Sequence, residues 1–169
     1  MASENKIRVA MLSFAHVHAR GYARQAQQNP RVELVAVWDE PEYGGKQAAE
    51  ELGLEFYSDL DALLSREDVD GVIVNAPTSM HAEVMIPAAR AGKHIFTEKA
   101  LAVTLADCDR IIAAVQEAGV QFMISLPQRC NPNVLFAKKA IEDGLLGELT
   151  FGRARGGPFR RPGPLVWGA

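Results

Sequence analysis

The stretch IRVAMLSFAHVHARGYARQAQQNPRVELVAVWDE, which covers residues 7–40, decides the fold. Two short apolar runs rich in branched side chains, Ile7 to Leu12 and Val32 to Trp38, flank a segment of helical period from about Val17 to Gln28. Asn29-Pro30 ends this segment because a residue before proline avoids helical geometry. Strand, helix and strand in this order make the repeating unit of a parallel sheet. The stretch therefore predicts an α/β fold.

The same alternation of short apolar runs and helical segments continues to about residue 126. The fully apolar run Val72 to Val74 is typical of a central strand that is covered on both faces. Six strands joined by right-handed helical crossovers make a doubly wound parallel sheet, the Rossmann fold. The other expected segments are helices at Gly45–Leu52, at Leu60–Leu64 with Ser58 as cap, from Thr78 to a break or restart at Pro87, and from Thr104 to Gly119, and strands at Leu54–Tyr57, His94–Phe96 and Gln121–Ser125.

Composition and charge narrow the class of protein. Of the 169 residues, 48% are hydrophobic and 23% are charged, as in an ordinary globular domain. The net charge of -3 gives no general attraction to nucleic acid or to an anionic membrane, and no window approaches the roughly 18 apolar residues of a membrane span. The polar start, Met1 to Lys6, lacks a signal region. Cys108 and Cys130 make neither a disulfide framework nor a metal-ligand cluster. We therefore expect a cytoplasmic protein whose partners include neither nucleic acid nor membrane.

The end of the chain changes character. Residues 1–126 are expected to form the Rossmann domain, and residues 127–169 a linker helix, one strand at Glu148 to Arg155 and a tail rich in glycine and proline. No further strand in this sequence pairs with that strand, so the segment reads as the start of a truncated second domain. The tail also carries a basic group, and its members are Arg153, Arg155, Arg160 and Arg161. We expect these side chains to be solvated rather than bound to nucleic acid.

The loop after the first strand stands where a dinucleotide fold binds pyrophosphate. It reads Ser13-Phe14-Ala15-His16-Val17-His18 and has none of the glycines of G-x-G-x-x-G. Ser13 and Ala15 are small enough for a close approach, and backbone N–H groups at a helix N-terminus bind anions whatever the side chains. We expect residues 13–17 to line the cofactor. His16 and His18 lack a third ligand in a clear motif, so no metal is predicted and they are expected to line the dinucleotide entrance.

The second strand ends at Trp38-Asp39, which we assign to the cofactor site. An acidic residue at this position accepts hydrogen bonds from the adenosine ribose hydroxyls. A carboxylate would repel the 2′-phosphate of NADP, so Asp39 favours NAD over NADP. The alternative is that Asp39 only starts a turn with Glu40-Pro41.

Three further strands end in polar residues at the same edge of the sheet. The fourth is followed by Asn75-Ala76-Pro77, with His81 one turn into the next helix. The fifth ends in Glu98-Lys99, and Arg129 follows the sixth. The carboxyl ends of parallel strands meet at one edge, where ligands of this fold bind.

This constellation resembles the N-terminal domain of the glucose–fructose oxidoreductase and inositol dehydrogenase family (Gfo/Idh/MocA). The resemblance covers most of the chain, and its most specific part is Gly-Lys-His-x-x-x-Glu-Lys. Two departures stand out: the loop lacks the family's glycines, and Ala100 replaces the proline of Glu-Lys-Pro. The matching pieces are Trp38-Asp39, Asn75-Ala76-Pro77 with His81, Ala91-Gly92-Lys93-His94, Glu98-Lys99, Ala118-Gly119, and Arg129 with Pro132.

The resemblance implies hydride transfer between a nicotinamide and a secondary alcohol of a sugar or polyol. It implies that Lys99 contacts the reacting oxygen, that Glu98 contacts the nicotinamide ribose, and that Asn75-Ala76-Pro77 line the cofactor. His81 and Arg129 would lie at the cofactor or substrate. The alternatives are an ion pair of Lys99 with Glu98, a helix-surface position for His81, and an ordinary salt bridge for Arg129.

The absence of the family's substrate domain leaves three hypotheses open. The first is the cofactor half of an oxidoreductase, with little turnover by itself. The second is a non-catalytic dinucleotide-binding or regulatory module that acts through a partner. The third is an oligomer in which the tail pairs with the sheet of another copy. Apolar surface that a second domain would cover predicts self-association, so we expect a homo-oligomer.

Overall fold

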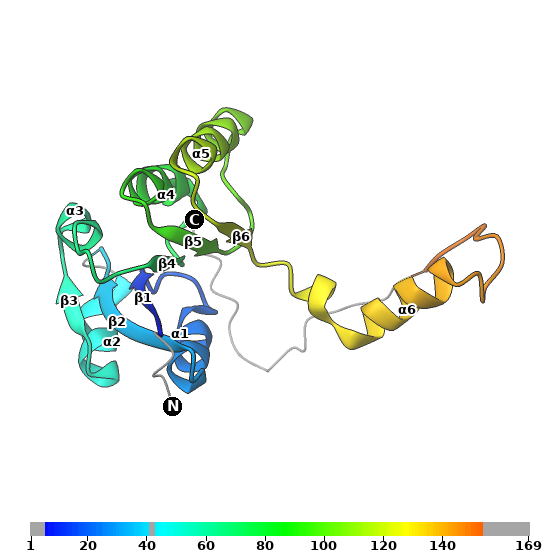
Figure 1. The fold of residues 1–169 in the computed structure, drawn as a ribbon, viewed down its shortest axis with the longest axis horizontal. Coiled ribbons are helices and arrows are strands. Elements are labelled where there is room, and N and C mark those ends of the chain that lie inside the picture. Colours follow the sequence, from blue (N-terminus) through cyan, green and yellow to red (C-terminus); the bar gives the residue numbers. More distant parts are fainter. Residues whose placement is uncertain (1–5, 41–42, 154–169) are drawn as a thin grey trace, which may run out of the picture. The chain divides into compact units, whose positions relative to one another are not determined.

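The computed structural model describes residues 6–40 and 43–153 (Figure 1). Six strands and a set of helices alternate along the chain as the apolar pattern predicts. The strands are β1 (Ile7–Leu12), β2 (Val32–Trp38), β3 (Glu55–Tyr57), β4 (Gly71–Val74), β5 (His94–Thr97) and β6 (Phe122–Ile124). The helices are α1 (Ala19–Gln28), α2 (Gly45–Leu52), α3 (Leu60–Leu64), α4 (His81–Arg90), α5 (Leu105–Ala118) and α6 (Pro132–Glu142), with short 3₁₀ turns η2 (Thr78–Met80) and η3 (Pro127–Cys130).

The strands form one parallel sheet in the order β3-β2-β1-β4-β5-β6. This is the doubly wound order: strands are added outward on one side from β1 to β3 and on the other from β4 to β6, and ligands bind outside the carboxyl ends near this switch point. In Figure 1, α1 and α2 lie on one side of the sheet, and α4 and α5 cover β4 to β6 from the other. The predicted Rossmann fold is therefore confirmed.

Two apolar clusters hold the layers together. The larger lies between the sheet and the helices α3, α4 and α5, and Leu12, Val74, Met85 and Ile111 are nearly inaccessible in it. The smaller packs α1 and α2 on the sheet and centres on Met11. Burial of apolar surface stabilises the folded state by about 25 cal/mol per Å². The two clusters therefore hold the strands and helices that position the carboxyl edge of the sheet.

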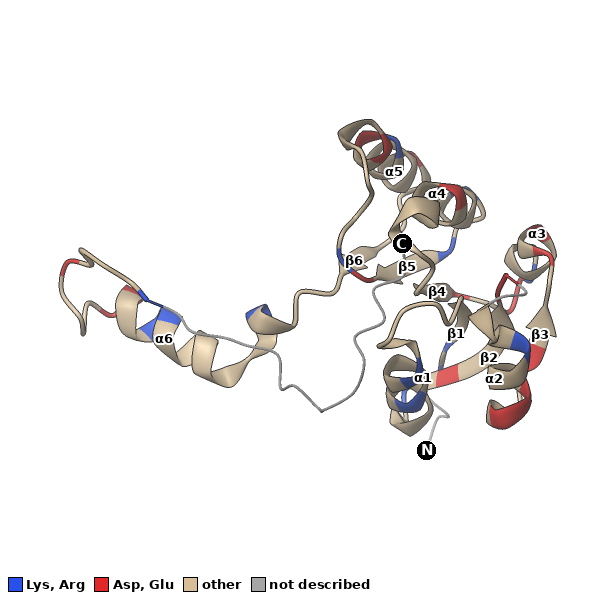
Figure 2. Cartoon of the chain, turned by 180° about the vertical axis from the view of Figure 1, so that it is seen from behind, with Lys and Arg blue, Asp and Glu red and all other residues tan. Residues whose placement is uncertain are grey.

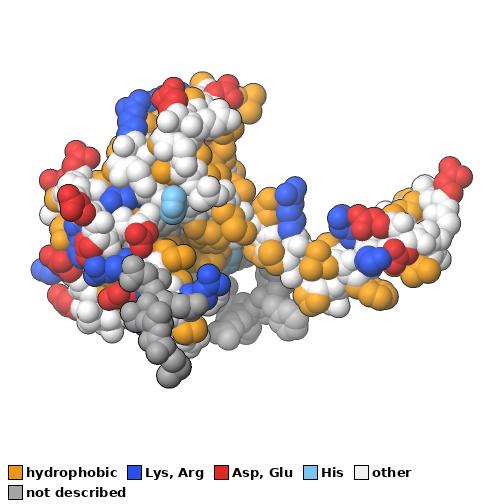
Figure 3. All heavy atoms as spheres, in the orientation of Figure 1, with side chains coloured by type: hydrophobic (Ala, Val, Ile, Leu, Met, Phe, Trp, Pro, Cys, Tyr) orange, Lys and Arg blue, Asp and Glu red, His pale blue; other side chains and the backbone are white. Residues whose placement is uncertain are grey.

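One half of the sheet keeps an uncovered apolar surface. The partly exposed Ile73 and Phe96 and the exposed Met123 line a groove of about 520 Å³ together with residues of β1 and β6. Figure 3 shows apolar side chains gathered in this region, beside β5 and β6. Exposed apolar surface is what the sequence leads us to expect where a second domain would pack, and self-association itself stays a prediction.

Three local predictions were wrong. Asp59, not Ser58, caps α3, because its carboxylate accepts from the N–H groups of Asp61 and Ala62. Pro87 lies inside α4 without ending it; the helix loses one hydrogen bond there, and the buried residues around it offset that loss. A strand was expected at Glu148 to Arg155, but residues 148–153 are not in a strand. Residues 154–155 lie outside the described part of the chain.

The contacts divide the chain into two compact units, Met1–Leu126 and Pro127–Ala169. The described part of the second unit consists of η3, α6 and the residues up to 153; Arg155, Arg160 and Arg161 of the expected basic group lie outside the described residues. Figure 2 shows acidic and basic residues spread over the helices. Among the described residues, no helix is both long enough and apolar enough to cross a membrane.

Candidate functional site

The loop between β1 and α1 begins with Ser13 in a left-handed conformation. Its φ is 74°, a region that L-residues other than glycine rarely adopt. The Ser13 N–H donates to the carbonyl of Trp38 (2.7 Å), and its Oγ accepts from the N–H of Ala15 (3.1 Å). A serine therefore makes the turn that the first glycine makes in a glycine-rich loop, and its hydroxyl holds the turn from inside.

The backbone donors of this loop are engaged within the protein. Phe14 N–H donates to Asp39 Oδ2 (2.9 Å), and His16 N–H donates to the carbonyl of Asn75 (3.1 Å). His18 N–H donates to Nδ1 of His16 at 3.3 Å. A phosphate bound at these three N–H groups would have to displace their internal partners, and the assignment of residues 13–17 to the cofactor site stays a prediction.

Asp39 is buried at the end of β2, with 1% of its surface exposed. Besides Phe14, the N–H of Glu40 donates to it (3.0 Å). Burial raises the pKa of Asp39, and hydrogen bonds from Ser13, Phe14, Glu40 and Gly45 oppose that rise. Gly45 opens α2 directly against this carboxylate, and a Cβ there would overlap the Asp39 side chain. Asp39 thus joins the loop to the start of α2 as well as ending its strand.

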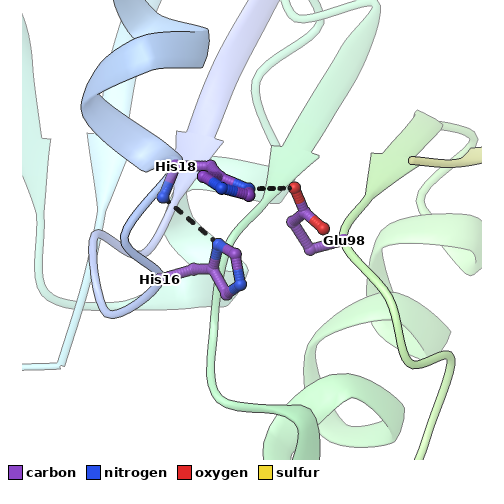
Figure 4. Close-up of side chains that lie close together, drawn as sticks. All are labelled: His16, His18 and Glu98. Atoms are coloured by element: carbon purple, nitrogen blue, oxygen red, sulfur yellow. Dashed lines mark hydrogen bonds and ion pairs between the residues drawn. The ribbon is translucent and has the colours of Figure 1, made fainter. Parts of the chain in front are cut away.

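Glu98 lies at the carboxyl end of β5 and is 1% exposed. Its Oε1 accepts from the hydroxyl of Tyr22 and from Nδ1 of His18, the latter at 2.8 Å (Figure 4). Its Oε2 accepts from the N–H of Lys99 at 3.2 Å. Burial raises the pKa of Glu98, but the hydrogen bonds from Tyr22 and His18 and the neighbouring Lys99 outweigh it and hold the pKa at about 2. Glu98 is therefore a carboxylate at neutral pH.

Lys99 follows Glu98 and turns toward solvent. About half of its side chain is exposed, and its Nζ lies 3.5 Å from Oε2 of Glu98. The peptide bond between Lys99 and Ala100 is cis. The side chain thus makes the ion pair that was the alternative to a catalytic role, while its exposure leaves it accessible to a ligand.

His16 and His18 lie close to Glu98, which follows His18 by 80 residues in the sequence. One potential ligand atom from each lies within 4.8 Å of the other two. Figure 4 shows both imidazole rings directed to the carboxylate side of the loop. Burial lowers the pKa of His16, with Glu98 opposing and His18 adding to that shift. Glu98, directly after β5, thus adds a third side chain of metal-ligating type beside the two histidines.

The segment after β4 packs against the loop. Asn75 is fully buried, its N–H donates to the carbonyl of Leu12 (2.7 Å), and its Oδ1 has no hydrogen-bond partner. His81 is also buried, neither on the helix surface nor open to a ligand. Its two ring nitrogens lie 3.1 and 3.0 Å from the carbonyls of Ala76 and Leu101, so the ring fixes the backbone on which Ala76 and Pro77 stand.

Two contributors were missed by the sequence argument. Tyr22, on the first turns of α1, donates to Glu98, and its hydroxyl lies 2.8 Å from Oγ of the buried Ser125. No sequence motif indicates either residue. For Tyr22 the sequence offers one indication, which is that it follows His18 by one helical turn. Arg129 belongs to the second unit, where it is exposed, and its assignment to the site stays a prediction.

The parallel six-stranded sheet, with buried polar side chains at its carboxyl edge, defines a Rossmann-type nucleotide-binding protein. The chain belongs to the Gfo/Idh/MocA oxidoreductase family, described as an oxidoreductase family with an NAD-binding Rossmann fold, whose pattern matches residues 7–126. The resemblance inferred from the motifs is thereby confirmed.

Similar proteins span several reactions. The chain is 41% identical over 131 residues to a 2,7-anhydro-N-acetylneuraminate hydratase of Mediterraneibacter gnavus, covering 78% of this chain and 34% of that protein. It is 36% identical to a myo-inositol 2-dehydrogenase of Thermotoga maritima, covering 68% and 35%. A 3-ketoreductase from Actinomadura kijaniata, solved with NADP, superposes with a TM-score of 0.76 at 30% identity, covering 85% and 44%. The chain thus spans about a third of the length of these curated relatives.

Proposed function

We propose that this chain is the cofactor-binding half of an NAD-dependent oxidoreductase that moves hydride to or from a secondary alcohol of a sugar or polyol. The observation that carries the proposal is the placement of Asp39 and Glu98-Lys99 at the carboxyl edge of the sheet, one at the end of β2 and the other at the end of β5. Ligands of doubly wound sheets bind outside this edge. Family membership supports the reaction class.

In this proposal Asp39 binds the adenosine ribose and Glu98 the nicotinamide ribose. The cofactor is lined by residues 13–17, Trp38, Asn75, Ala76 and Pro77, and His81 holds the last of these segments in place. The nicotinamide supplies or accepts the hydride. Lys99 Nζ accepts or returns the hydroxyl proton, since about half of its side chain is exposed and can reach a ligand.

The Asp39 side chain and the solved relatives point to different forms of the cofactor. The Asp39 carboxylate suits two ribose hydroxyls and disfavours a 2′-phosphate, which supports NAD. Solved relatives include an NADP complex, so the choice needs a direct test. Sugar or polyol substrates, a cytoplasmic location and a homo-oligomer stay predictions. Because the chain covers about a third of its curated relatives, we expect little turnover from it alone.

Titration calorimetry with NAD and with NADP tests the proposal. We expect saturable NAD binding that is tighter than NADP binding, and a loss of roughly 10- to 100-fold in NAD affinity in Asp39→Asn, because that variant removes hydrogen bonds to a charged acceptor. Asp109→Asn, at an exposed position on α5, is the matched control and should bind as the unaltered chain does. No binding of either nucleotide would contradict the proposal.

A second candidate is a non-catalytic dinucleotide-binding or regulatory module. The observation in its favour is the loop, whose backbone donors at Phe14, His16 and His18 already have internal partners. A site that must first release those partners binds a pyrophosphate more weakly. Nucleotide binding with no turnover in the complete protein would favour this candidate.

A further inference from the structure

We propose that His16, His18 and Glu98 form a binding site for a divalent transition-metal ion of the Zn²⁺ class. The site lies between the β1–α1 loop and the end of β5, and the close-up in Figure 4 shows its three side chains. Two histidines and one carboxylate make a common zinc and iron ligand set that leaves positions open for water or a substrate oxygen. The proposal does not rest on nucleotide binding.

The geometry needs only small side-chain adjustments. Ligand atoms around tetrahedral zinc lie about 3.3 Å apart. Here one pair, His18 Nδ1 and Glu98 Oε1, is 2.8 Å apart, and all three ligand atoms lie within 4.8 Å. His18 is exposed and His16 partly exposed, so both rings can rotate, while the carboxylate they would approach is fixed by burial.

Further contacts of Glu98 fit a metal ligand. A ligating carboxylate is normally held by hydrogen bonds from its other neighbours. Tyr22 and the N–H of Lys99 donate to Glu98, and Ser125 lies 2.8 Å from the Tyr22 hydroxyl. These partners would remain when an ion replaces the hydrogen bond from His18. The carboxylate is thus oriented before any ion arrives.

The loop itself presents groups suited to a cation. In a glycine-rich loop, backbone N–H groups face an anion. In this loop the N–H groups of Phe14, His16 and His18 bind internal acceptors, and the side chains that converge outside are two imidazoles. The loop therefore presents two imidazole side chains to a cation, one of them, His18, at a position where the glycine-rich motif has glycine.

One charge opposes the ion. Lys99 Nζ lies 3.5 Å from Oε2 of Glu98, so its positive charge would repel a metal held by that carboxylate. About half of the side chain is exposed, so solvent screens much of this repulsion. This repulsion provides a test of the ion's position. If the ion lies beside Glu98, removal of the Lys99 charge must increase the affinity for the metal.

Cobalt titration of the untagged protein, without nucleotide, tests the proposal. Co²⁺ reports coordination by visible absorption, and Zn²⁺ calorimetry gives the stoichiometry. We expect one equivalent to bind, at least tenfold weaker binding in His18→Ala and in Glu98→Gln, and severalfold tighter binding in Lys99→Met. His18→Ala changes an exposed side chain, so its fold should survive even if Glu98→Gln disturbs the core, and circular dichroism checks both.

Two controls separate this site from other metal-binding groups. His94→Ala removes an exposed histidine at the other end of β5, and Cys130→Ser removes an exposed thiol. Both should bind Co²⁺ as the unaltered protein does. Absence of saturable binding, full affinity in His18→Ala, or loss of binding in either control would overturn the proposal. Because no nucleotide is present, none of these results bears on NAD binding.

Discussion

The two edges of the sheet use their charged side chains differently. At the amino edge, Arg66 donates to both carboxylate oxygens of Asp68 at 2.9 and 2.7 Å, and Arg8 pairs with the same carboxylate at 2.8 Å. Lys93 completes this edge, because its Nζ donates to two backbone carbonyls that precede β4. Each of these charges has a partner of the kind that stabilises the fold.

At the carboxyl edge the acidic groups Asp39 and Glu98 are buried, and only Glu98 has cationic side chains beside it. Asp39 is 1% exposed and accepts only from backbone N–H groups and Ser13. Glu98 is equally buried, with the partly solvated His18 and Lys99 beside it, and the buried Oδ1 of Asn75 has no partner. Buried polar groups without full pairing cost stability, and Arg8 Nε at the amino edge is such an atom as well. What distinguishes the carboxyl edge is its two nearly inaccessible carboxylates, Asp39 and Glu98, which indicate that this edge serves a ligand.

Lys93→Met gives the largest expected effect and tests the structural half of this comparison. The variant leaves the carbonyls of Arg66 and Val69 without their donor in a site where Lys93 is 7% exposed. Unsatisfied buried groups cost about 1–3 kcal/mol, so we expect a loss of about 2 kcal/mol in the free energy of unfolding. Urea denaturation measures it, and nucleotide affinity should stay unchanged.

Lys46→Met, at an exposed position on α2, is the matched control. It removes the same charge and should change the free energy of unfolding by less than about 0.5 kcal/mol. If Lys93→Met proved as stable as this control, the amino edge would not have the structural role given to it here.

The fold was predictable because it depends on apolar periodicity. The runs at β1 and β2 and the helix bounds at α2 are matched closely by the sequence pattern. One of the misses came where two local choices are nearly equal in free energy. Ser58 and Asp59 can both cap a helix, and only the hydrogen bonds to Asp61 and Ala62 decide between them.

The site was predictable only in part, for a different reason. The carboxyl-edge rule placed Asp39 and Glu98 at the right edge of the sheet from position alone. The rule says nothing about which helix residues turn back toward them, so Tyr22 was missed. The meeting of His18 with a carboxylate 80 residues later is a tertiary contact with no sequence signal, so the cluster of His16, His18 and Glu98 was not predicted.

A pair of variants at Ser13 probes the strained loop of the carboxyl edge and should show a medium effect. Ser13→Ala loses the acceptor for Ala15 N–H and keeps a Cβ at a φ of 74°. Ser13→Gly loses the same acceptor but removes the Cβ. We expect the glycine variant to be the more stable of the two by about 1 kcal/mol, measured by urea denaturation.

Gly53→Ala calibrates this difference. Gly53 ends α2 at a φ of 68°, and a Cβ there would meet nothing within 4 Å, so the variant measures the left-handed conformation with little else. Its cost should match the difference between the two Ser13 variants. Equal stability of Ser13→Ala and Ser13→Gly would mean that the loop in solution has a different backbone.

The smallest expected effect concerns pH and the amino edge. The hydrogen bonds from Arg66, together with the charges of Arg66 and Arg8, hold the pKa of Asp68 at about 2, below the value of about 3.9 expected in an unfolded chain. A carboxyl group with a lowered folded pKa contributes stability above its unfolded pKa, and that contribution is lost as the pH falls toward 2.

Asp68→Asn removes the contribution, so the stability of this variant should fall less steeply than that of the unaltered protein between about pH 5 and 3. Asp68 is partly exposed, so the difference should be small and should shrink further in high salt. Urea midpoints at several pH values measure it, with Asp109→Asn as the matched exposed aspartate; parallel curves for all three proteins would show that this ion pair adds nothing to the amino edge.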